Sequence, residues 1–246
     1  MDVLHTGHWL GKSISFLPKD TLNILGKYFS IQESGHDVSI LSERDIEFCF
    51  FYYDPIQTQS LLMTSIKMCQ NLDKKLILIH DDKIDTNFLD LDVILDSYNV
   101  QGSNIESWTE TLSKNIHYLF SRHQEVIHLH RNKKHFEENK ISKDLAEILR
   151  YIDSHISETI REEDIADYCH YSVTYFSRLF HQSIGMSFRD YLTSKRISLA
   201  KHLLLSERES KIASIAYQCG YKDVSYFSRI FKKKTGITPA SFRQIH

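Results

Sequence analysis

The feature that most constrains this chain is a hexapeptide that occurs twice in its C-terminal half. The letters YFSRLF stand at residues 175–180 and return as YFSRIF at 226–231, fifty-one residues later. Several residues of the upstream stretch 165–171 recur in 215–221 at an offset of fifty. Two copies are too few for a solenoid, whose core closes only with three or more repeats. The pattern therefore indicates one supersecondary motif that has been duplicated.

Each copy has the pattern of two short helices joined by a tight turn. In the second copy, Ser210 and Asp223 are predicted as N-caps of the two helices, and Gly220 suits a left-handed turn between them. In the first copy, Ser172 is the N-cap of the second helix, and His170 replaces the glycine, so its turn is expected to be relieved differently. The residues predicted to face inward are Phe176, Leu179 and Phe180, and then Tyr226, Phe227, Ile230 and Phe231.

The outward face of each second helix carries small hydroxyl side chains and long cations. Arginine can donate two hydrogen bonds to guanine, and serine or threonine can approach base edges or phosphates. A solvated face on an ordinary helical bundle is the plainer interpretation, but an arginine at the same position in both copies favours DNA. The predicted DNA-binding residues are Thr174, Ser177, Arg178, His181, Val224, Ser225, Ser228, Arg229, Lys232, Lys233 and Lys234.

Residues 141–246 resemble the DNA-binding region of AraC/XylS-type transcription regulators. The resemblance rests on IADYCHYSVTYFSRLFHQSIGMSFRDYL, on KRISLAKHLL and on IASIAYQCGYKDVSYFSRIFKKKTGITPASFR, and it covers about two-fifths of the chain. It implies two helix-turn-helix units, joined by a long helix over about residues 187–205, that enter successive major-groove segments of promoter double-stranded DNA. RNA polymerase is the further partner that it implies for an activator of this type.

Charge divides the chain into two different halves. The formal net charge is −2, but residues 141–246 carry sixteen Lys or Arg against twelve Asp or Glu, and residues 1–140 carry fourteen against twenty. From Arg178 onward the count is thirteen against four. Such asymmetry is typical of a chain in which one half binds nucleic acid. In the basic half, Arg208 and Lys211 are expected to contact phosphates, whereas Arg196 is expected to serve the fold.

The N-terminal half alternates continuous apolar runs with helical segments, which predicts an α/β domain with a five-stranded parallel sheet covered on both faces. Predicted strands cover 13–17, 38–41, 46–53, 75–80 and 91–95, and predicted helices cover 19–29, 57–71 and 104–121. This order is similar to that of the receiver domains of two-component response regulators. We therefore predict a receiver-like regulatory or dimerisation domain over 1–122, a linker over 123–140 and an AraC-type domain over 141–246.

Asp54 ends the predicted central strand, where the phosphorylated aspartate of a receiver would stand. The rest of that chemistry is missing: no acidic pair follows the first predicted strand, His80 replaces a hydroxyl residue, and the last strand lacks a lysine. Without Mg²⁺ ligands and a positive charge, phosphoryl transfer is not expected. Asp54 is thus interpreted as a vestigial phosphoacceptor in a domain for homodimerisation or protein contact, with a phosphorylation-dependent regulator as the alternative.

No cofactor, metal or catalytic site is predicted. The potential metal ligands are Cys49, Cys69, Cys169, Cys219, His123, His128, His130 and His135. The cysteines lack ligand spacing, and no cysteine or carboxylate completes a tetrahedral set around the histidines. A non-enzymatic regulator is therefore predicted, with a DNA-associated enzyme as the alternative. No signal peptide or membrane-length apolar run is found, which predicts a cytoplasmic protein.

Overall fold

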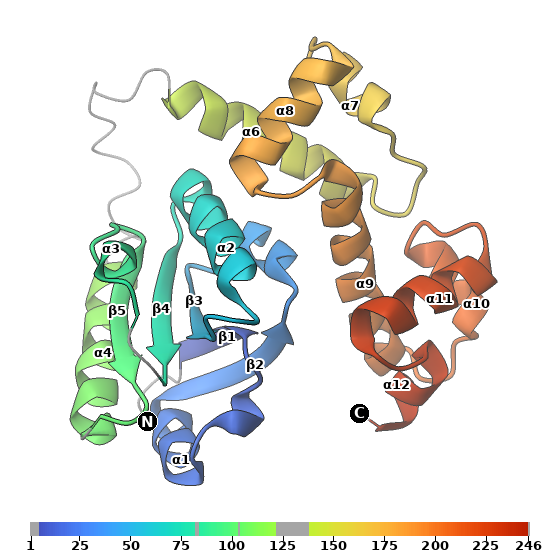
Figure 1. Cartoon of the computed structure of the whole chain (residues 1–246). Coiled ribbons are helices and arrows are strands. Elements are labelled where there is room, and N and C mark those ends of the chain that lie inside the picture. The colour runs from blue at the N-terminus through green and yellow to red at the C-terminus, as the bar shows by residue number, and fades with distance from the viewer. Residues whose placement is uncertain (1–4, 82–83, 103, 122–137, 246) are drawn as a thin grey trace. The chain divides into compact units, whose positions relative to one another are not determined.

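The computed structural model describes residues 5–81, 84–102, 104–121 and 138–245, and the chain forms two compact units, Met1–Ser142 and Lys143–His246. The first unit is a sheet with helices, and the second is entirely helical where it is described (Figure 1). Most of the predicted linker, including the histidines between 123 and 135, lies outside the described residues. None of the described helices is long and apolar enough to cross a membrane.

The N-terminal unit is built on a five-stranded parallel sheet in the order β2-β1-β3-β4-β5, which confirms the predicted fold class. The strands are β1 (His5–Gly11), β2 (Phe29–Gly35), β3 (Phe48–Tyr53), β4 (Lys75–His80) and β5 (Ile94–Asn99). The α-helices between and after them are α1 (Lys19–Tyr28), α2 (Gln59–Leu72), α3 (Thr86–Leu89) and α4 (Ile105–Ser121). Parallel neighbours require such crossover connections, which place helices on the faces of the sheet.

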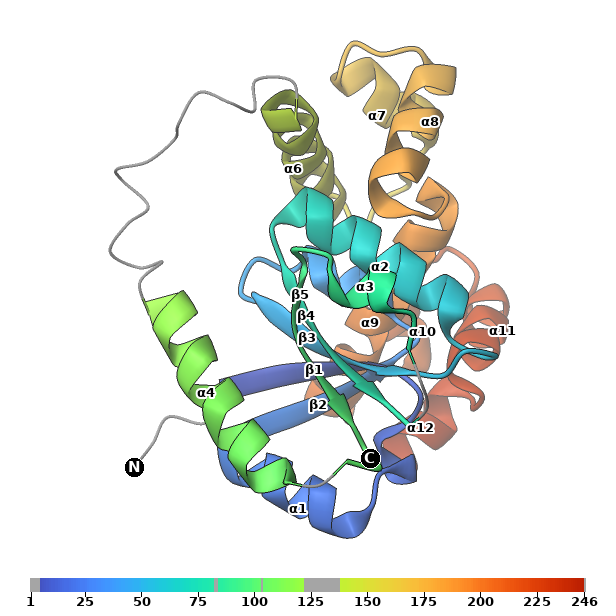
Figure 2. The same ribbon diagram turned by 60° about the vertical axis from the view of Figure 1, so that its left-hand side comes forward.

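Both faces of the central strand are covered. Helices α1 and α4 lie on one side of the sheet and α2 on the other (Figure 2). The first side holds a core that includes Trp9, Phe50 and Leu112, while Leu62 and Ile66 of α2 are buried on the second. All six residues of β3 are consequently buried, which explains why the sequence of this strand is a continuous apolar run rather than an alternating one.

Two of the predicted strands are wrong. Residues 13–17 contain a short 3-10 helix, η1 (Ile14–Phe16), and residues 38–41 lie in a second one, η2 (Val38–Ser42). Ser13 and Asp37 each accept a hydrogen bond from the backbone two residues onward, which favours a turn over an extended strand. One true edge strand, β2, begins directly after α1, and only Phe29 of its seven residues is buried, so it has no apolar run. β5 also begins three residues later than predicted.

The C-terminal unit contains most of α6 and six further described helices. These seven helices are α6 (Glu138–Ser154), α7 (Glu162–Tyr168), α8 (Val173–Ile184), α9 (Phe188–Ser206), α10 (Ile212–Gln218), α11 (Val224–Thr235) and α12 (Pro239–Ile245). The pairs α7–α8 and α10–α11 are the two predicted copies, and α9 is the predicted long helix between them. Leu145, Ile148 and Ile152 of α6 are buried, and Asp153 near its end forms an ion pair with Lys195 of α9.

Helix α9 contributes to the cores of both copies. At its N-terminal end, the ring of Phe188 lies 5.8 Å from that of Phe180, measured between centroids, and the ring of Tyr191 lies 5.4 Å from it. Toward its C-terminal end, Ala200 and Leu204 join the second core, which is centred on the two phenylalanines of the repeated hexapeptide in α11. The connector is thus packed on both sides rather than being a free spacer.

Candidate nucleic-acid interface

The turns of the two copies have the same backbone conformation. His170 has φ of 58° and Gly220 has φ of 78°, and in each turn the next residue donates its N–H to the carbonyl of an equivalent alanine. The expectation that the first turn is relieved differently is therefore wrong. His170 is exposed, whereas a Cβ on Gly220 would lie 2.6 Å from the carbonyl oxygen of Ile156. The second turn thus needs glycine for lack of space as well as for conformation.

The second helices of the two copies, α8 and α11, begin and end at equivalent residues. Ser172 and Asp223 accept hydrogen bonds from the backbone N–H three residues onward, as predicted for N-caps. Gly185 and Gly236 end the helices in the left-handed conformation. The prediction of Ser210 as an N-cap is wrong, because α10 begins one residue later with Lys211 at its N-cap.

Most of the predicted DNA-binding side chains are exposed on these two helices. Exposed on α8 are Thr174, Ser177, Arg178 and His181, and exposed on α11 are Ser225, Arg229, Lys232, Lys233 and Lys234. Val224 and Ser228 are half-buried, and Val224 packs against the core of the second copy. At matching positions the two helices therefore expose an arginine and a hydroxyl side chain, and only the second carries a run of three lysines.

A tyrosine in each copy belongs to the same surface, and the sequence interpretation missed it. Tyr226, predicted to face inward, is 37% exposed, and Tyr175 is 45% exposed. The guanidinium of Arg229 lies over the ring of Tyr226, 5.3 Å from its centroid. Each tyrosine directly precedes a buried phenylalanine, and neighbouring positions on a helix differ in direction by about 100°. This difference in direction means that a tyrosine and the phenylalanine after it cannot both face the core, and it is the sequence signal that was missed.

Arg196 of α9 holds the fold together, in line with its expected role. Its Nε donates to the carbonyl oxygen of Ile156 at 3.1 Å, and its Nη2 donates to that of Glu158. The guanidinium also lies 5.7 Å from the ring centroid of Tyr221. Burial lowers the pKa of Arg196 and raises that of Tyr221 to about 12, so the Tyr221 hydroxyl is neutral at physiological pH. Of the expected phosphate contacts, Arg208 and Lys211 are both exposed.

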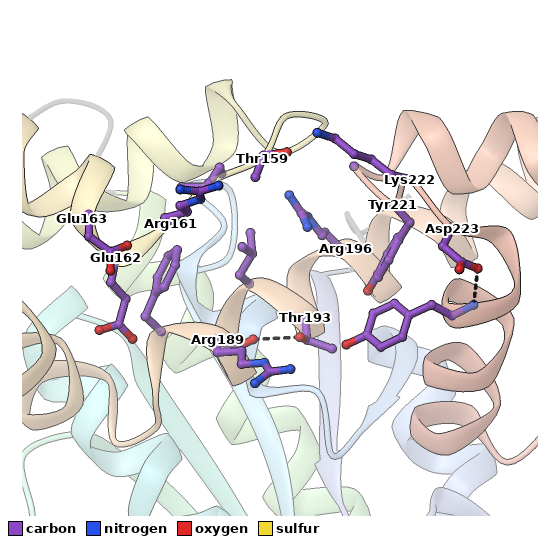
Figure 3. A pocket seen from close by; sticks show the side chains of 15 residues that line it. Thr159, Arg161, Glu162, Glu163, Arg189, Thr193, Arg196, Tyr221, Lys222 and Asp223 are labelled. Carbon is purple, nitrogen blue, oxygen red and sulfur yellow. Dashed lines mark hydrogen bonds between the residues drawn. The ribbon is translucent and has the colours of Figure 1, made fainter.

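A cavity of about 580 Å³ opens between the two copies, against α9 (Figure 3). Its walls come from residues 159–163 before and at the start of α7, from one face of α9, and from the turn and first residues of the second copy. The cationic side chains that line it are Arg161, Arg189, Arg196 and Lys222, and the acidic ones are Glu162, Glu163 and Asp223. Sequence reasoning did not anticipate that these cations converge, because they come from three separate segments.

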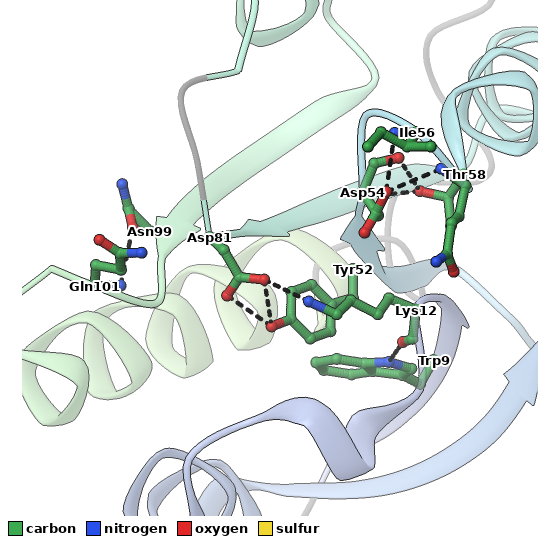
Figure 4. A network of polar contacts seen from close by, with 10 residues as sticks. Trp9, Lys12, Tyr52, Asp54, Ile56, Thr58, Asp81, Asn99 and Gln101 are labelled. Atoms are coloured by element: carbon green, nitrogen blue, oxygen red, sulfur yellow. Dashed lines mark hydrogen bonds and ion pairs between the residues drawn. The ribbon is translucent and has the colours of Figure 1, made fainter.

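In the N-terminal unit, polar groups meet at the carboxyl edge of the sheet (Figure 4). Lys12, directly after β1, forms an ion pair with Asp81, directly after β4, at 2.7 Å. The hydroxyl of Tyr52 on β3 donates to the same carboxylate at 2.7 Å. Burial and this hydrogen bond raise the pKa of Tyr52. Sequence reasoning missed the pair, because the true β1 ends at residue 11 rather than 17.

Asp54 follows β3 at the same edge but is tied into its own turn. Its Oδ1 accepts hydrogen bonds from the backbone N–H groups of Ile56 and Gln57, both at 2.9 Å. Its own backbone N–H donates to the hydroxyl of Thr58 at 2.8 Å. The carboxylate therefore organises the entry into α2. Directly after β1, where a receiver would have acidic side chains, Lys12 stands instead.

The four cysteines are considered next as possible metal ligands or reactive thiols. Cys49, Cys69 and Cys219 are buried, and all four cysteines are free thiols. Burial raises the pKa of Cys69 and that of Cys219 to about 12, which keeps both thiols protonated and unreactive. Within the described residues, no group of three or more His, Cys, Asp or Glu could hold a metal ion.

Comparison with known proteins finds similarity in the C-terminal unit. Residues 165–245 match the helix-turn-helix domain family. The chain is 40% identical over 96 residues to the regulatory protein PocR of Salmonella typhimurium, which is 39% of this chain and 31% of PocR. It is 38% identical over 98 residues to the bifunctional transcriptional activator/DNA repair enzyme AdaA of Bacillus subtilis, which is 40% of this chain and 46% of AdaA. The match thus spans less than half the length of each of these relatives.

A solved structure also resembles part of the chain. The C-terminal domain of AraT, a response regulator from Geobacillus stearothermophilus, is 35% identical with a TM-score of 0.42, and the match covers 44% of this chain and 88% of that one. The family match at residues 165–245 lies within the unit that holds the two repeated copies. The family match does not include the N-terminal unit.

Proposed function

We propose, from the AraC-type helix-turn-helix domain that residues 165–245 form, that this chain is a sequence-specific DNA-binding transcription regulator. The observation that carries the proposal is the duplicated exposed face, in which Arg178 and Arg229 occupy the same position on equivalent helices. Arginine at such a position is the residue that most often recognises guanine in the major groove.

The proposed binding mode places α8 and α11 in successive major-groove segments on one side of a duplex. Such segments lie about 34 Å apart. Helix α9, with 19 residues, is about 28 Å long at a rise of about 1.5 Å per residue. With one copy packed at each end, it is of the right length to hold two recognition helices at that separation. The basic run Lys232–Lys234 then serves as a phosphate clamp beside the second helix.

For the N-terminal unit we propose a non-catalytic role, in homodimerisation or in contact with a signal or protein partner. Its sheet order is the doubly wound one in which ligands meet the carboxyl edge. At that edge, however, Lys12 and Asp81 neutralise each other and the Asp54 carboxylate caps a turn. RNA polymerase is the proposed further partner on promoter DNA.

The alternative is a regulator phosphorylated on Asp54, or an enzyme associated with DNA. Asp54→Asn separates the phosphorylated regulator from the proposal. The asparagine side chain keeps an oxygen that can accept the two backbone hydrogen bonds, so DNA affinity and promoter activity are expected to change by less than about twofold. The measurement is a reporter assay in cells, together with incubation of the purified chain with a labelled small phosphoryl donor.

Asp54→Ala is the matched control for that substitution. It removes the acceptor and is expected to lower stability by about 1 kcal/mol, as loss of an N-terminal cap does. Loss of promoter activity in Asp54→Asn, combined with phosphoryl transfer to the unmodified chain alone, would establish the phosphorylated regulator instead.

The proposal as a whole is tested by selecting duplexes from a random pool with the full chain. The selected duplex should bind at least about a thousandfold more tightly than a scrambled duplex of equal length at physiological salt. Its footprint should show two protected major-groove segments one helical turn apart. Equal affinity for both duplexes would overturn sequence-specific binding, and one protected segment would overturn the two-helix mode.

A further inference from the structure

The cavity between the two copies has a concentration of positive charge that the recognition helices do not use. Arg161, Arg189 and Lys222 are exposed at its rim, and Arg196 is half-buried in its wall (Figure 3). Within the described parts of the chain, none of these four cations forms an ion pair with a carboxylate. The charge is therefore open to an anion from outside the chain.

Arg196 is the deepest of the four cations. Its two hydrogen bonds go to neutral carbonyl oxygens, those of Ile156 and Glu158, through Nε and Nη2. Among the residues that the structure describes, none accepts a hydrogen bond from Nη1. A half-buried cation without a counter-ion loses hydration and gains no ion pairing, and an anion brought into the cavity would supply that pairing.

The acidic residues of the cavity are not distributed evenly. Glu162 and Glu163 lie on one side of the opening, away from Arg196 and Lys222, in Figure 3. Asp223 lies beside Lys222, but its carboxylate accepts a hydrogen bond from the backbone N–H of Tyr226 at 2.8 Å. The favourable side for an anion is therefore the one formed by Arg189, Arg196 and Lys222.

We infer that this side of the cavity receives the DNA backbone phosphates that lie between the two major-groove segments, an inference that rests on the proposed function. Lys222 directly precedes the helix-capping Asp223 of α11, and Arg189 is the second residue of the connector α9. The cations thus border both recognition helices. When these helices occupy successive major-groove segments, the intervening strand backbone is the polyanion presented to the cavity between them. Arg189 and Lys222 donate to its phosphates, and Arg196 contributes its charge from behind.

The test uses the full chain, a selected duplex and a scrambled one, and the variants Arg189→Ala and Lys222→Ala. Each variant should lose about tenfold in affinity for both duplexes alike, and each should reduce the slope of log affinity against log salt by about one. Arg150→Ala is the matched control, since this exposed arginine lies on α6 outside the cavity, and it should change neither quantity. Equal thermal melting of all variants shows that the fold is retained.

Replacing DNA phosphates by uncharged methylphosphonates tests which phosphates Arg189 and Lys222 contact. Methylphosphonates placed between the two protected segments should weaken binding by the unmodified chain about tenfold, and Arg189→Ala should lose little more on that duplex. The inference is wrong if the affinity losses from Arg189→Ala and from the methylphosphonates simply add. It is also wrong if neither variant loses affinity while the unmodified chain binds its selected duplex. In both cases the proposed function stands. If the unmodified chain does not distinguish the duplexes, the proposed function fails first.

Inorganic phosphate separates DNA from a free anion as the source. Titration into the chain without DNA should show no saturation below about 10 mM, because a single phosphate lacks the anchoring by two recognition helices. Saturable binding that Lys222→Ala abolishes, with no effect of central methylphosphonates on DNA binding, would identify a small phosphate compound as the occupant and overturn the inference.

Discussion

Alanine at Gly220 is expected to destabilise the C-terminal unit by about 2–4 kcal/mol, while glycine at His170 is expected to leave it unchanged or up to about 1 kcal/mol more stable. The two positions are equivalent and both have positive φ. At Gly220 a Cβ would meet a backbone carbonyl at 2.6 Å and the guanidinium of Arg196 at 2.7 Å, so steric overlap adds to conformational strain. At exposed His170 only the strain is present, and glycine removes it at some cost in chain entropy.

The distribution of tryptophan makes this comparison measurable in the full chain. Both tryptophans, Trp9 and Trp108, belong to the N-terminal unit. In urea titrations, tryptophan fluorescence therefore follows that unit, while far-ultraviolet circular dichroism mostly follows the helical C-terminal unit. Gly220→Ala should shift the second transition to lower urea and leave the first in place. Equal stability of Gly220→Ala and the unmodified chain would show that the second turn can accommodate a Cβ, against this expectation.

Removing Arg178 or Arg229, the two arginines proposed to contact bases, should cost about 1–3 kcal/mol of binding free energy at the selected duplex and relax preference at a few base pairs. The losses in Arg178→Ala and Arg229→Ala should be nearly additive, because the residues lie on different helices with separate surroundings. Arg229→Ala also removes the contact of the guanidinium with the ring of Tyr226, so Tyr226→Phe, which keeps the ring, should cost much less than Tyr226→Ala.

The lysine run gives the contrasting result. Replacing Lys232, Lys233 or Lys234 by alanine should weaken binding to selected and scrambled duplexes alike and lower the salt slope by about one for each phosphate contact that is removed. Both sets of variants are measured by fluorescence anisotropy over a range of salt concentrations. If the arginine variants behave as the lysine variants do, the arginines contact phosphates, and base recognition falls to the hydroxyl residues of α8 and α11. If they lose thermal stability instead, the repeated hexapeptide serves the fold.

The C-terminal unit was predictable because its signals are local. Ser172 and Asp223 are polar caps ahead of aromatic stripes, and both capped helices begin where predicted. Duplication allowed each copy to be checked against the other. Prediction failed where position within a helix was ambiguous, as for Tyr226, and where a conformation was inferred from residue type alone, as for His170.

The N-terminal unit was predictable in class and less so in detail. The central strands β3 and β4 are buried on both faces and leave continuous apolar runs. The flanking strands β1 and β2 mix polar with apolar residues, so the nearest apolar runs, at η1 and η2, were mistaken for them. The ion pair of Lys12 with Asp81 depends on residues 69 apart in the chain meeting at one edge, and no local pattern encodes that meeting.

The hold of Arg196 on the carbonyls of Ile156 and Glu158, beside the ring of Tyr221, has a consequence for operator architecture. Arg196 of α9 contacts both the segment ahead of the first copy and the turn of the second. The angle between the two copies is therefore fixed relative to α9. If the two copies bind DNA as proposed, affinity should therefore depend on the spacing and rotation between the two groove segments. One base pair inserted between the recognised segments moves the second by about 3.4 Å and turns it by about 35° around the duplex axis. A flexibly tethered pair of domains would absorb that change. In the proposed binding mode, by contrast, this connector should lose one of its two groove contacts, so only one spacing between the two segments should be permitted.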